Sequence, residues 1–413
     1  MFEAPRGTRD FPPWEMDKRR YVEDKIRNTF KIYGYREIQT PTFEHLQVFT
    51  LKSGDAIIDE IYSFKDKGGR DLALRPELTA PVIRFYVEKL QMEPKPLKLF
   101  YIGNCFRYDR PQKGRYREFT QAGCELIGVD TPEAIAELIA LAYNILRNIG
   151  LKNVDLHIGD LTILSTLFKK LGISDENKKE IIPLIDKEKF DELYLFMQNI
   201  GVSKDEIEWF LDVLKMDDIS KLPVSDEIEE EVERLKDVFG FLRDIYSIDC
   251  KMKLSIVRGL DYYKDIVFEI EAPILGAEKQ LCGGGIYELI PLFGGREAPS
   301  AGFAIGFDRA ILAAETEGYR FPISTIDYYI IPLSTSLISK SIEIAQILRN
   351  KGLLVDVDLM RRGIGKALKY AGSINAKQTI LLGPDELDKN AVTIRDMVTG
   401  EQKLVLIEEL KNL

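Results

Sequence analysis

This 413-residue chain is poor in cysteine, histidine and tryptophan, and it lacks long apolar runs. It holds no Cys-x-x-Cys pair, and its cysteines and histidines are Cys105, Cys124, Cys250, Cys282, His45 and His157. This pattern excludes a zinc site of the usual spacing and favours buried, reduced cysteines. No stretch approaches the ~20 apolar residues that cross a bilayer, and the charged start, residues 1–10, does not fit a secretory signal. We therefore expect a cytoplasmic protein without a membrane partner.

Acidic residues exceed basic ones, but they are unevenly distributed. The formal net charge is −10, and residues 160–237 hold 11 Lys and Arg against 21 Asp and Glu, which accounts for the whole excess. By contrast, residues 107–117 contain four arginines and one lysine. A local basic patch can bind phosphates on a protein that is acidic overall.

The length predicts two or three domains. Hydrophobic spacing predicts a helix over 21–33, an extended run over 35–43, a long hairpin from 97–106 and 118–127, and a helix over 132–149. An acidic helical module follows over 160–240, and strands resume at 252–257 and 266–270. After a boundary near 320–325, strands and helices alternate (strands 327–332, 353–357, 378–382 and 393–398; helices 335–351 and 365–374). This alternation predicts a small α/β domain with a largely parallel sheet.

Four short clusters carry candidate chemistry, and each has a plainer structural interpretation. Residues 75–79 (RPELT) fit a helix start with Pro in its first turn, and residues 107–117 fit a solvated turn. The Tyr pair in 258–263 (RGLDYY) fits aromatic packing, and the small residues in 302–309 (GFAIGFDR) fit close strand–helix packing. However, Gln121 and Glu125 lie four apart on the strand after the basic loop, so both face the same side of the sheet. Polar side chains there indicate a small-molecule site.

Taken together and in this order, the clusters resemble the class II aminoacyl-tRNA synthetases, and within them the histidyl-tRNA synthetase family. Residues 6–10 (RGTRD) look like the family's opening signature. Residues 21–44, 106–125 and 302–312 are similar to the three class motifs, and 258–263 to the signature of the histidine enzymes. The resemblance runs over nearly the whole chain and is weakest in the helical module.

The resemblance implies an α+β fold, in which an antiparallel sheet with flanking helices forms a class II catalytic domain over 1–320. A helical insertion would occupy about 160–245, and an α/β anticodon-binding domain would occupy 326–413. The first motif builds the dimer interface in this class, so a homodimer is expected. The implied activity is activation of L-histidine by ATP, with Mg²⁺ on the phosphates, and transfer of histidine to the 3′ end of tRNA(His).

The resemblance also assigns residues to the ATP. Arg107 would bind the α-phosphate, Arg309 the γ-phosphate, and Arg115 the ATP tail. Arg258 would approach the α-phosphate, where charge develops as the histidine carboxylate attacks. No general base is needed for that step, because a carboxylate is already ionised. Catalysis would then rest on positioning and electrostatic stabilisation.

For the other substrates, the resemblance implies a second set. Glu77, Thr79 and Gln121 would hold the α-amino end of histidine. Glu125 and Tyr263 would bracket the ring nitrogens, Tyr287 would close the pocket, and Tyr262 belongs to the same histidine-binding set. Such a site rejects amino acids that leave its polar groups unpaired. Arg110 and Gln112, at the loop tip, would read the tRNA acceptor end.

The chain departs from the family pattern at a few positions: Ile286 and Glu288 around Tyr287, Tyr108 and Asp109 after Arg107, Leu78, and Asp308. Three alternatives stay open. One is a histidine-sensing regulatory subunit of ATP phosphoribosyltransferase without aminoacylation, although that paralogue typically lacks the last domain and some phosphate-binding arginines. The others are a synthetase for another amino acid, and an interaction module such as the synthetase-like domain of a stress kinase.

Overall fold

The chain folds into two compact units in a computed structural model that describes residues 2–110, 114–257 and 263–412. The first unit runs to Asp10 and continues over Arg19–Arg320, and the second comprises Phe11–Lys18 and Phe321–Leu413. No helix among the described residues is long and apolar enough to cross a membrane.

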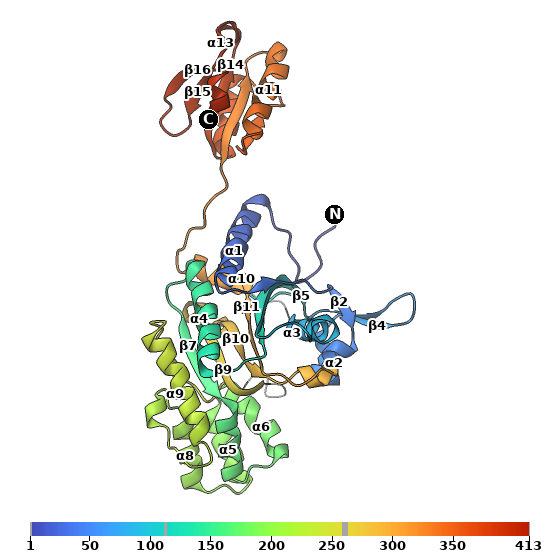
Figure 1. The fold of residues 1–413 in the computed structure, drawn as a ribbon, viewed down its shortest axis with the longest axis vertical. Coiled ribbons are helices and arrows are strands. Elements are labelled where there is room, and N and C mark those ends of the chain that lie inside the picture. The colour runs from blue at the N-terminus through green and yellow to red at the C-terminus, as the bar shows by residue number, and fades with distance from the viewer. Residues whose placement is uncertain (1, 111–113, 258–262, 413) are drawn as a thin grey trace. The chain divides into compact units, whose positions relative to one another are not determined.

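An eight-stranded sheet forms the centre of the first unit, in the order β1-β5-β6-β11-β10-β9-β7-β8 (Figure 1). The strands are β1 Arg36–Glu37, β5 Leu97–Phe106, β6 Glu118–Ile127, β7 Asp155–Asp160, β8 Lys251–Met252, β9 Tyr263–Glu271, β10 Gln280–Tyr287 and β11 Ser300–Gly306. The six inner strands pair antiparallel, and only the edge strands β1 and β8 pair parallel. The predicted antiparallel sheet is confirmed, and β5 and β6 form the predicted hairpin with the expected bounds.

Helices and a small sheet surround the large sheet. These elements are α1 Pro13–Ile32, α2 Gln47–Ser53, α3 Thr79–Phe85, α4 Pro132–Asn148 and α10 Phe307–Thr316, with β2 Phe43–His45, β3 Ser63–Lys65 and β4 Asp71–Leu74. Helix α1 buries Val22, Ile26 and Phe30, which share one helix face at a spacing of four. The ring of Phe30 stacks on Phe100 of β5 with centroids 4.7 Å apart. The predicted helix over 21–33 is therefore confirmed, although it begins eight residues earlier.

The acidic segment is helical, as predicted, and Figure 1 shows its helices gathered beside β7 and β9. They are α5 Leu161–Lys170, α6 Asp175–Asp186, α7 Phe190–Asn199, α8 Lys204–Leu214 and α9 Glu229–Asp244. Side chains of Asp160, Ser174 and Ser203 accept hydrogen bonds at the starts of α5, α6 and α8. Each helix turns a few apolar residues inward and leaves its charges on the surface, which explains why an acidic segment folds.

Two sequence expectations for the first unit are wrong in detail. The strand predicted over 252–257 is reduced to β8, because Leu254, Ile256 and Val257 are buried by packing and do not pair in the sheet. The extended run over 35–43 yields only the two residues of β1 before β2 begins at Phe43. Over 253–257, apolar residues therefore serve side-chain burial without a strand partner.

The second unit carries a five-stranded sheet in the order β13-β12-β14-β15-β16. Its elements are β12 Ile326–Pro332, α11 Ile338–Arg349, β13 Val355–Val357, α12 Ile364–Ser373, β14 Ala376–Leu382, α13 Pro384–Asp388, β15 Ala391–Asp396 and β16 Gln402–Leu406. Strands β13, β12 and β14 are parallel, but β15 and β16 pair antiparallel. The predicted parallel character holds only for the first half, because the connections after β14 are too short for the crossover that parallel strands need.

Candidate active site

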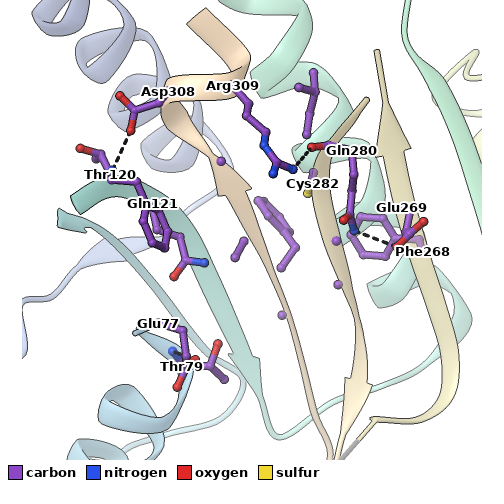
Figure 2. Close-up of a pocket in the computed structure, with 18 of the residues that line it drawn as sticks. Glu77, Thr79, Thr120, Gln121, Phe268, Glu269, Gln280, Cys282, Asp308 and Arg309 are labelled. Carbon is purple, nitrogen blue, oxygen red and sulfur yellow. Dashed lines mark hydrogen bonds between the residues drawn. The ribbon is translucent and has the colours of Figure 1, made fainter. Parts of the chain in front are cut away.

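A pocket of about 410 Å³ lies on one face of the large sheet, over β6, β11, β10 and β9. Figure 2 shows Thr120 and Gln121 on one wall, Glu269 and Gln280 on the other, and Glu77 and Thr79 at one end. The floor is glycine-rich, because Gly283, Gly284, Gly302 and Gly306 line the pocket. Side chains from distant parts of the chain therefore meet above a glycine-rich part of the sheet.

A buried carboxyl occupies one end of the pocket. Glu125, only 1% exposed, accepts hydrogen bonds from Tyr101 (3.1 Å to Oε1) and Tyr287 (2.5 Å to Oε2). Burial raises the pKa of Glu125 to about 7, although hydrogen bonds from Tyr287, Thr79 and Tyr101 oppose the rise. The carboxyl is thus poised to change charge near neutral pH and is held in one orientation.

The sheet register leaves space for this carboxyl. Gly302 of β11 pairs directly with Glu125 of β6. A Cβ at position 302 would lie 2.1 Å from Glu125 Oε2 and 2.5 Å from the carbonyl oxygen of Cys124. Only glycine leaves room there for a carboxyl turned over the sheet.

Aromatic rings and amide groups complete this end. The rings of Tyr263 and Tyr287 meet edge to face with centroids 6.5 Å apart. Gln121 lines the pocket on the same strand as Glu125, and its side-chain oxygen faces the Cys105 thiol at 3.7 Å. The expectation that Gln121 and Glu125 share one face of the sheet is confirmed.

Glu77 lies just before α3, and its contacts with the helix start differ from those expected from the sequence. Its carboxylate accepts hydrogen bonds from the backbone N–H groups of Thr79 (2.8 Å) and Ala80 (3.1 Å). The helix begins at Thr79, so Pro76 lies before it and outside its first turn. The prediction of a proline at the helix start is therefore wrong, because the side chain of Glu77 supplies the cap.

Three arginines line the pocket away from the buried carboxyl: Arg107, Arg115 and Arg309. Arg107 donates from Nε to the carbonyl of Pro76 (3.0 Å), and Arg115 Nε lies 3.1 Å from Asp109. Asp109, one of the departures from the expected pattern, thus provides a carboxylate for Arg115.

Arg309 is held by three neighbours. It donates to the carbonyl of Gln280 at 3.1 Å (Figure 2). It also donates to the carbonyl of Gly114 at 3.1 Å and pairs with the Glu278 carboxylate at 2.5 Å. These contacts fix the guanidinium over the pocket. An incoming phosphate can exchange with the carboxylate of Glu278 because both are anions that suit the same donor fork.

Asp308 organises the segment next to Arg309. Its carboxylate accepts from Arg9 (2.8 Å), Arg19 (2.6 Å) and the backbone N–H of Thr120 (2.9 Å), although it is only 8% exposed. The Arg9 guanidinium also lies 3.3 Å from the centre of the Tyr116 ring. The Asp308 carboxylate accepts from three donors and so links α10 to β6 and to the N-terminal segment.

The other departures also have local explanations. Leu78 is buried in an apolar cluster with Val82, Leu99 and Tyr101. Ile286 is buried, and Glu288 forms an ion pair with Lys264 on the surface. None of the three introduces an unpaired charge into the pocket.

Several predicted residues lie elsewhere. Arg258, Tyr262 and Gln112 fall outside the described residues, and Arg110 is exposed and does not line the pocket. Conversely, the sequence analysis missed Tyr101, Asp308 as an anchor, Glu269 and Gln280. Tyr101 pairs directly with Gly123, so the hairpin register places it on the same face as Gln121 and Glu125. An explicit register for the hairpin would have identified it.

Comparison with known proteins gives one consistent result. A family model described as histidyl-tRNA synthetase matches residues 7–310, and one described as an anticodon binding domain matches residues 327–413. The histidine–tRNA ligase of Methanosarcina acetivorans is 45% identical over 98% of this chain and 97% of that protein. That of Methanocaldococcus jannaschii is also 45% identical, over 100% of this chain and 99% of that protein.

Solved structures agree. Apo histidyl-tRNA synthetase of S. aureus aligns with a TM-score of 0.75 and 30% identity, covering 100% of this chain and 99% of that one. A Bacillus halodurans structure described as an ATP phosphoribosyltransferase regulatory subunit/histidyl-tRNA synthetase aligns with a TM-score of 0.79 and 25% identity, covering 90% of this chain and 96% of that one. With the family model and these full-length relatives in accord with the pocket, the chain belongs to the histidyl-tRNA synthetase family of class II aminoacyl-tRNA synthetases.

Proposed function

We propose that this chain activates L-histidine with ATP to histidyl-adenylate and then transfers the histidyl group to the 3′ end of tRNA(His). One observation carries the proposal: a single pocket joins a buried carboxyl, Glu125, to three arginines. The first end suits an imidazole and the second a triphosphate. The reaction requires both ligands in one cavity, with their reacting atoms held close together.

At the ring end, the roles follow from hydrogen-bonding capacity. Imidazole presents one N–H donor and one acceptor when neutral. The ionised Glu125 accepts the N–H, and the rings of Tyr263 and Tyr287, which line the same pocket, would flank the imidazole. An amino acid without ring nitrogens would leave this buried carboxyl unpaired, which disfavours its binding.

At the amino end, Glu77, Thr79 and Gln121 are proposed to receive the histidine ammonium. The carboxylate of Glu77 keeps lone pairs beyond the two that cap α3, because each oxygen accepts more than one hydrogen bond. The capping bonds hold this carboxylate in place before the substrate arrives. Tyr262 is proposed for the same substrate.

At the phosphate end, Arg107 would bind the α-phosphate, Arg309 the γ-phosphate and Arg115 the ATP tail. Arg258 is proposed to approach the α-phosphate as the carboxylate of histidine attacks it and pyrophosphate leaves. The arginines stabilise charge on the phosphate oxygens, and no protein base is required because the nucleophile is already ionised.

Mg²⁺ is expected to accompany ATP, and the neighbouring donors fit it. Magnesium prefers oxygen ligands, usually one or two carboxylates together with substrate phosphates. Glu269 lines the pocket and Glu278 pairs with Arg309 at its edge. These two carboxylates would hold the ion, which neutralises charge on the phosphates when bound.

For the second step, Arg110 and Gln112 are proposed to contact the tRNA acceptor end, and residues 326–413 to bind the anticodon. The exposure of Arg110 supports this role, because RNA phosphates must reach it from outside the pocket. We further propose a cytoplasmic homodimer.

The regulatory-subunit alternative is less well supported. A protein that only senses histidine needs the ring end of the pocket and no triphosphate site. This chain keeps Arg107 and Arg309 in the pocket and has a second unit, which the anticodon binding domain model matches over 327–413. Pocket arginines are expected in an enzyme that binds ATP, and an anticodon-binding unit is expected in one that binds tRNA.

Charging of tRNA tests the proposed function. Purified protein should attach radiolabelled histidine to a tRNA(His) transcript when ATP and Mg²⁺ are present. Arg309→Met should reduce this charging at least ~100-fold, because oxyanion-type donors typically contribute 10²–10³ in rate. Histidine binding without charging by the wild type would favour the regulatory alternative.

A further inference from the structure

The helical insertion is attached to the sheet directly behind the ring end of the pocket. It leaves at Asp160, the last residue of β7, which pairs with Ile266 of β9. The next residue, Leu161, packs with Ile256 and Val267 in an apolar cluster that also contacts Tyr263. The first residues of the insertion therefore support the tyrosine that we place against the imidazole.

Strand β9 is irregular just after that tyrosine. Tyr263 pairs with Tyr287, and Val267 pairs with Gly285. Strand β9 thus holds three residues between these pairs where β10 holds one, which makes a bulge. Asp265, inside the bulge, has a φ of 71°. This left-handed conformation is uncommon outside glycine, and bulges near active sites often redirect a side chain.

Arg234 of the insertion binds this bulge. Its guanidinium pairs with the Asp265 carboxylate and also reaches the carbonyl of Asp130, just before α4. The Arg234 side chain is about one-quarter exposed and that of Asp265 only 15%. One arginine of α9 thus connects the insertion, the bulge and the start of α4.

Asp160 supplies a second buried carboxyl beside that of Asp265. Asp160 Oδ1 caps α5 by accepting from Ile163 N at 2.9 Å, whereas its Oδ2 and Asp265 Oδ1 are buried and receive no hydrogen bond from an N–H or O–H of another residue. The two carboxyls interact, and burial followed by the charge of Asp265 raises the pKa of Asp160 to about 8. Burial also raises the pKa of Asp265, against the opposing charge of Arg234. One proton on Asp160 would give both free oxygens a shared hydrogen bond.

We propose that Arg234, Asp265 and Asp160 form a positioning unit through which the helical insertion holds the β9 bulge, and with it Tyr263, in the conformation that binds histidine. This inference rests on the proposed function and assigns a task to the insertion. The three residues do not touch the substrate. They act through Tyr263, so they should affect histidine more than ATP.

Histidine-dependent ATP–pyrophosphate exchange, with KM measured separately for histidine and ATP, tests this unit. Arg234→Met and Asp265→Asn should each raise the KM for histidine about 10- to 100-fold, since small misplacements at a site have effects of this size. The KM for ATP should change less than about twofold. Lys236→Met is the matched control, because Lys236 lies on the same helix and pairs with Glu233 on the surface. It should leave both constants unchanged.

Asp160→Asn separates positioning from general stability. The Asn amide keeps the cap oxygen and supplies a permanent donor to Asp265, so the KM for histidine should stay near the wild-type value at pH 7. In the wild type, raising the pH through about 8 removes the shared proton and should increase this KM, whereas Asp160→Asn should show a flatter profile. The charged groups that face the pair are Arg234, Asp130 and Lys264.

The inference is overturned if Arg234→Met and Asp265→Asn behave like Lys236→Met, or if they raise both KM values equally. If either variant fails to fold, the pH profiles of the wild type and Asp160→Asn decide, and identical profiles would contradict it. A wild-type protein that does not activate histidine would instead refute the proposed function.

Discussion

Glu125 is both deeply buried and ionisable, two features that are unfavourable together unless a ligand binds the carboxyl. It is buried beneath two tyrosine hydroxyl groups, and its pKa is raised to about 7 by burial. A purely structural site would place a neutral amide there at lower cost in free energy, because burying a carboxylate is unfavourable. An ionisable acceptor in this position suits a ligand that brings its own N–H donor.

Glu125→Gln tests this interpretation. The amide keeps the size of the side chain but presents a donor that competes with the imidazole N–H. We expect the KM for histidine in pyrophosphate exchange to rise about 10- to 100-fold, equivalent to 1–3 kcal/mol. The KM for ATP should change little. An unchanged KM for histidine would remove Glu125 from the ring-binding role.

The same residue predicts a pH dependence of stability. The pKa of Glu125 rises from about 4.3 in an unfolded chain to about 7 in the folded protein. The folded state therefore holds a proton that the unfolded chain has released, so this stabilisation is present below about pH 4 and is lost as the pH rises through about 7. It amounts to at most about 4 kcal/mol.

We expect the melting temperature of the ligand-free wild type to fall more between pH 5 and pH 8 than that of Glu125→Gln, as measured by scanning calorimetry. Other titrating groups, including Asp160, are shared by the two proteins and cancel in the comparison. Parallel curves for the two proteins would show that this carboxyl does not titrate as described.

Among the secondary-structure elements, strand β11 contains two glycines that differ in the space available for a side chain. A Cβ at Gly302 would lie 2.1 Å from Glu125 Oε2, whereas one at Gly306 would meet nothing closer than 3.7 Å. Gly302→Ala should therefore lower the melting temperature and weaken histidine binding, with a loss of stability of about 1–3 kcal/mol from overpacking. Gly306→Ala should melt close to the wild type. Similar melting temperatures for the two variants would contradict the packing described here.

The sequence predicted elements well where one physical signal dominated. Hydrophobic spacing located α4 and the hairpin of β5 and β6, and short apolar runs between helical segments located β12 and β14. It failed over 253–257, because a buried apolar run has the same pattern whether or not it pairs in a sheet. It located β15 approximately, but it missed β16 and the antiparallel pairing of both strands, which depends on connection length.

The pocket was predicted mainly through resemblance, because its residues come from distant segments. Spacing alone related only Gln121 to Glu125. It could not bring Tyr101 beside Glu125, or Asp308 beside Arg9 and Arg19, since those contacts depend on sheet register and helix placement. The bulge at Asp265 likewise has no local signature, because the arginine that binds it lies 31 residues earlier.

At the scale of the whole molecule, the proposed homodimer gives a direct prediction. Sedimentation equilibrium at micromolar concentration should return twice the chain mass of 47.2 kDa. We propose that the contact between the two copies involves residues 21–44, the segment that resembles the first motif, which covers residues 21–32 of α1 and all of β1. A single species at the chain mass would contradict the proposed assembly while leaving the pocket assignment in place.

We propose that histidine is the amino acid activated in this pocket. ATP–pyrophosphate exchange measured with each of the twenty amino acids in turn tests it most directly. We predict exchange with histidine alone, because its small ring combines an N–H donor for Glu125 with an acceptor nitrogen, a pairing that no other amino-acid side chain presents in a ring. Exchange with a different amino acid, or none with histidine, would contradict the account.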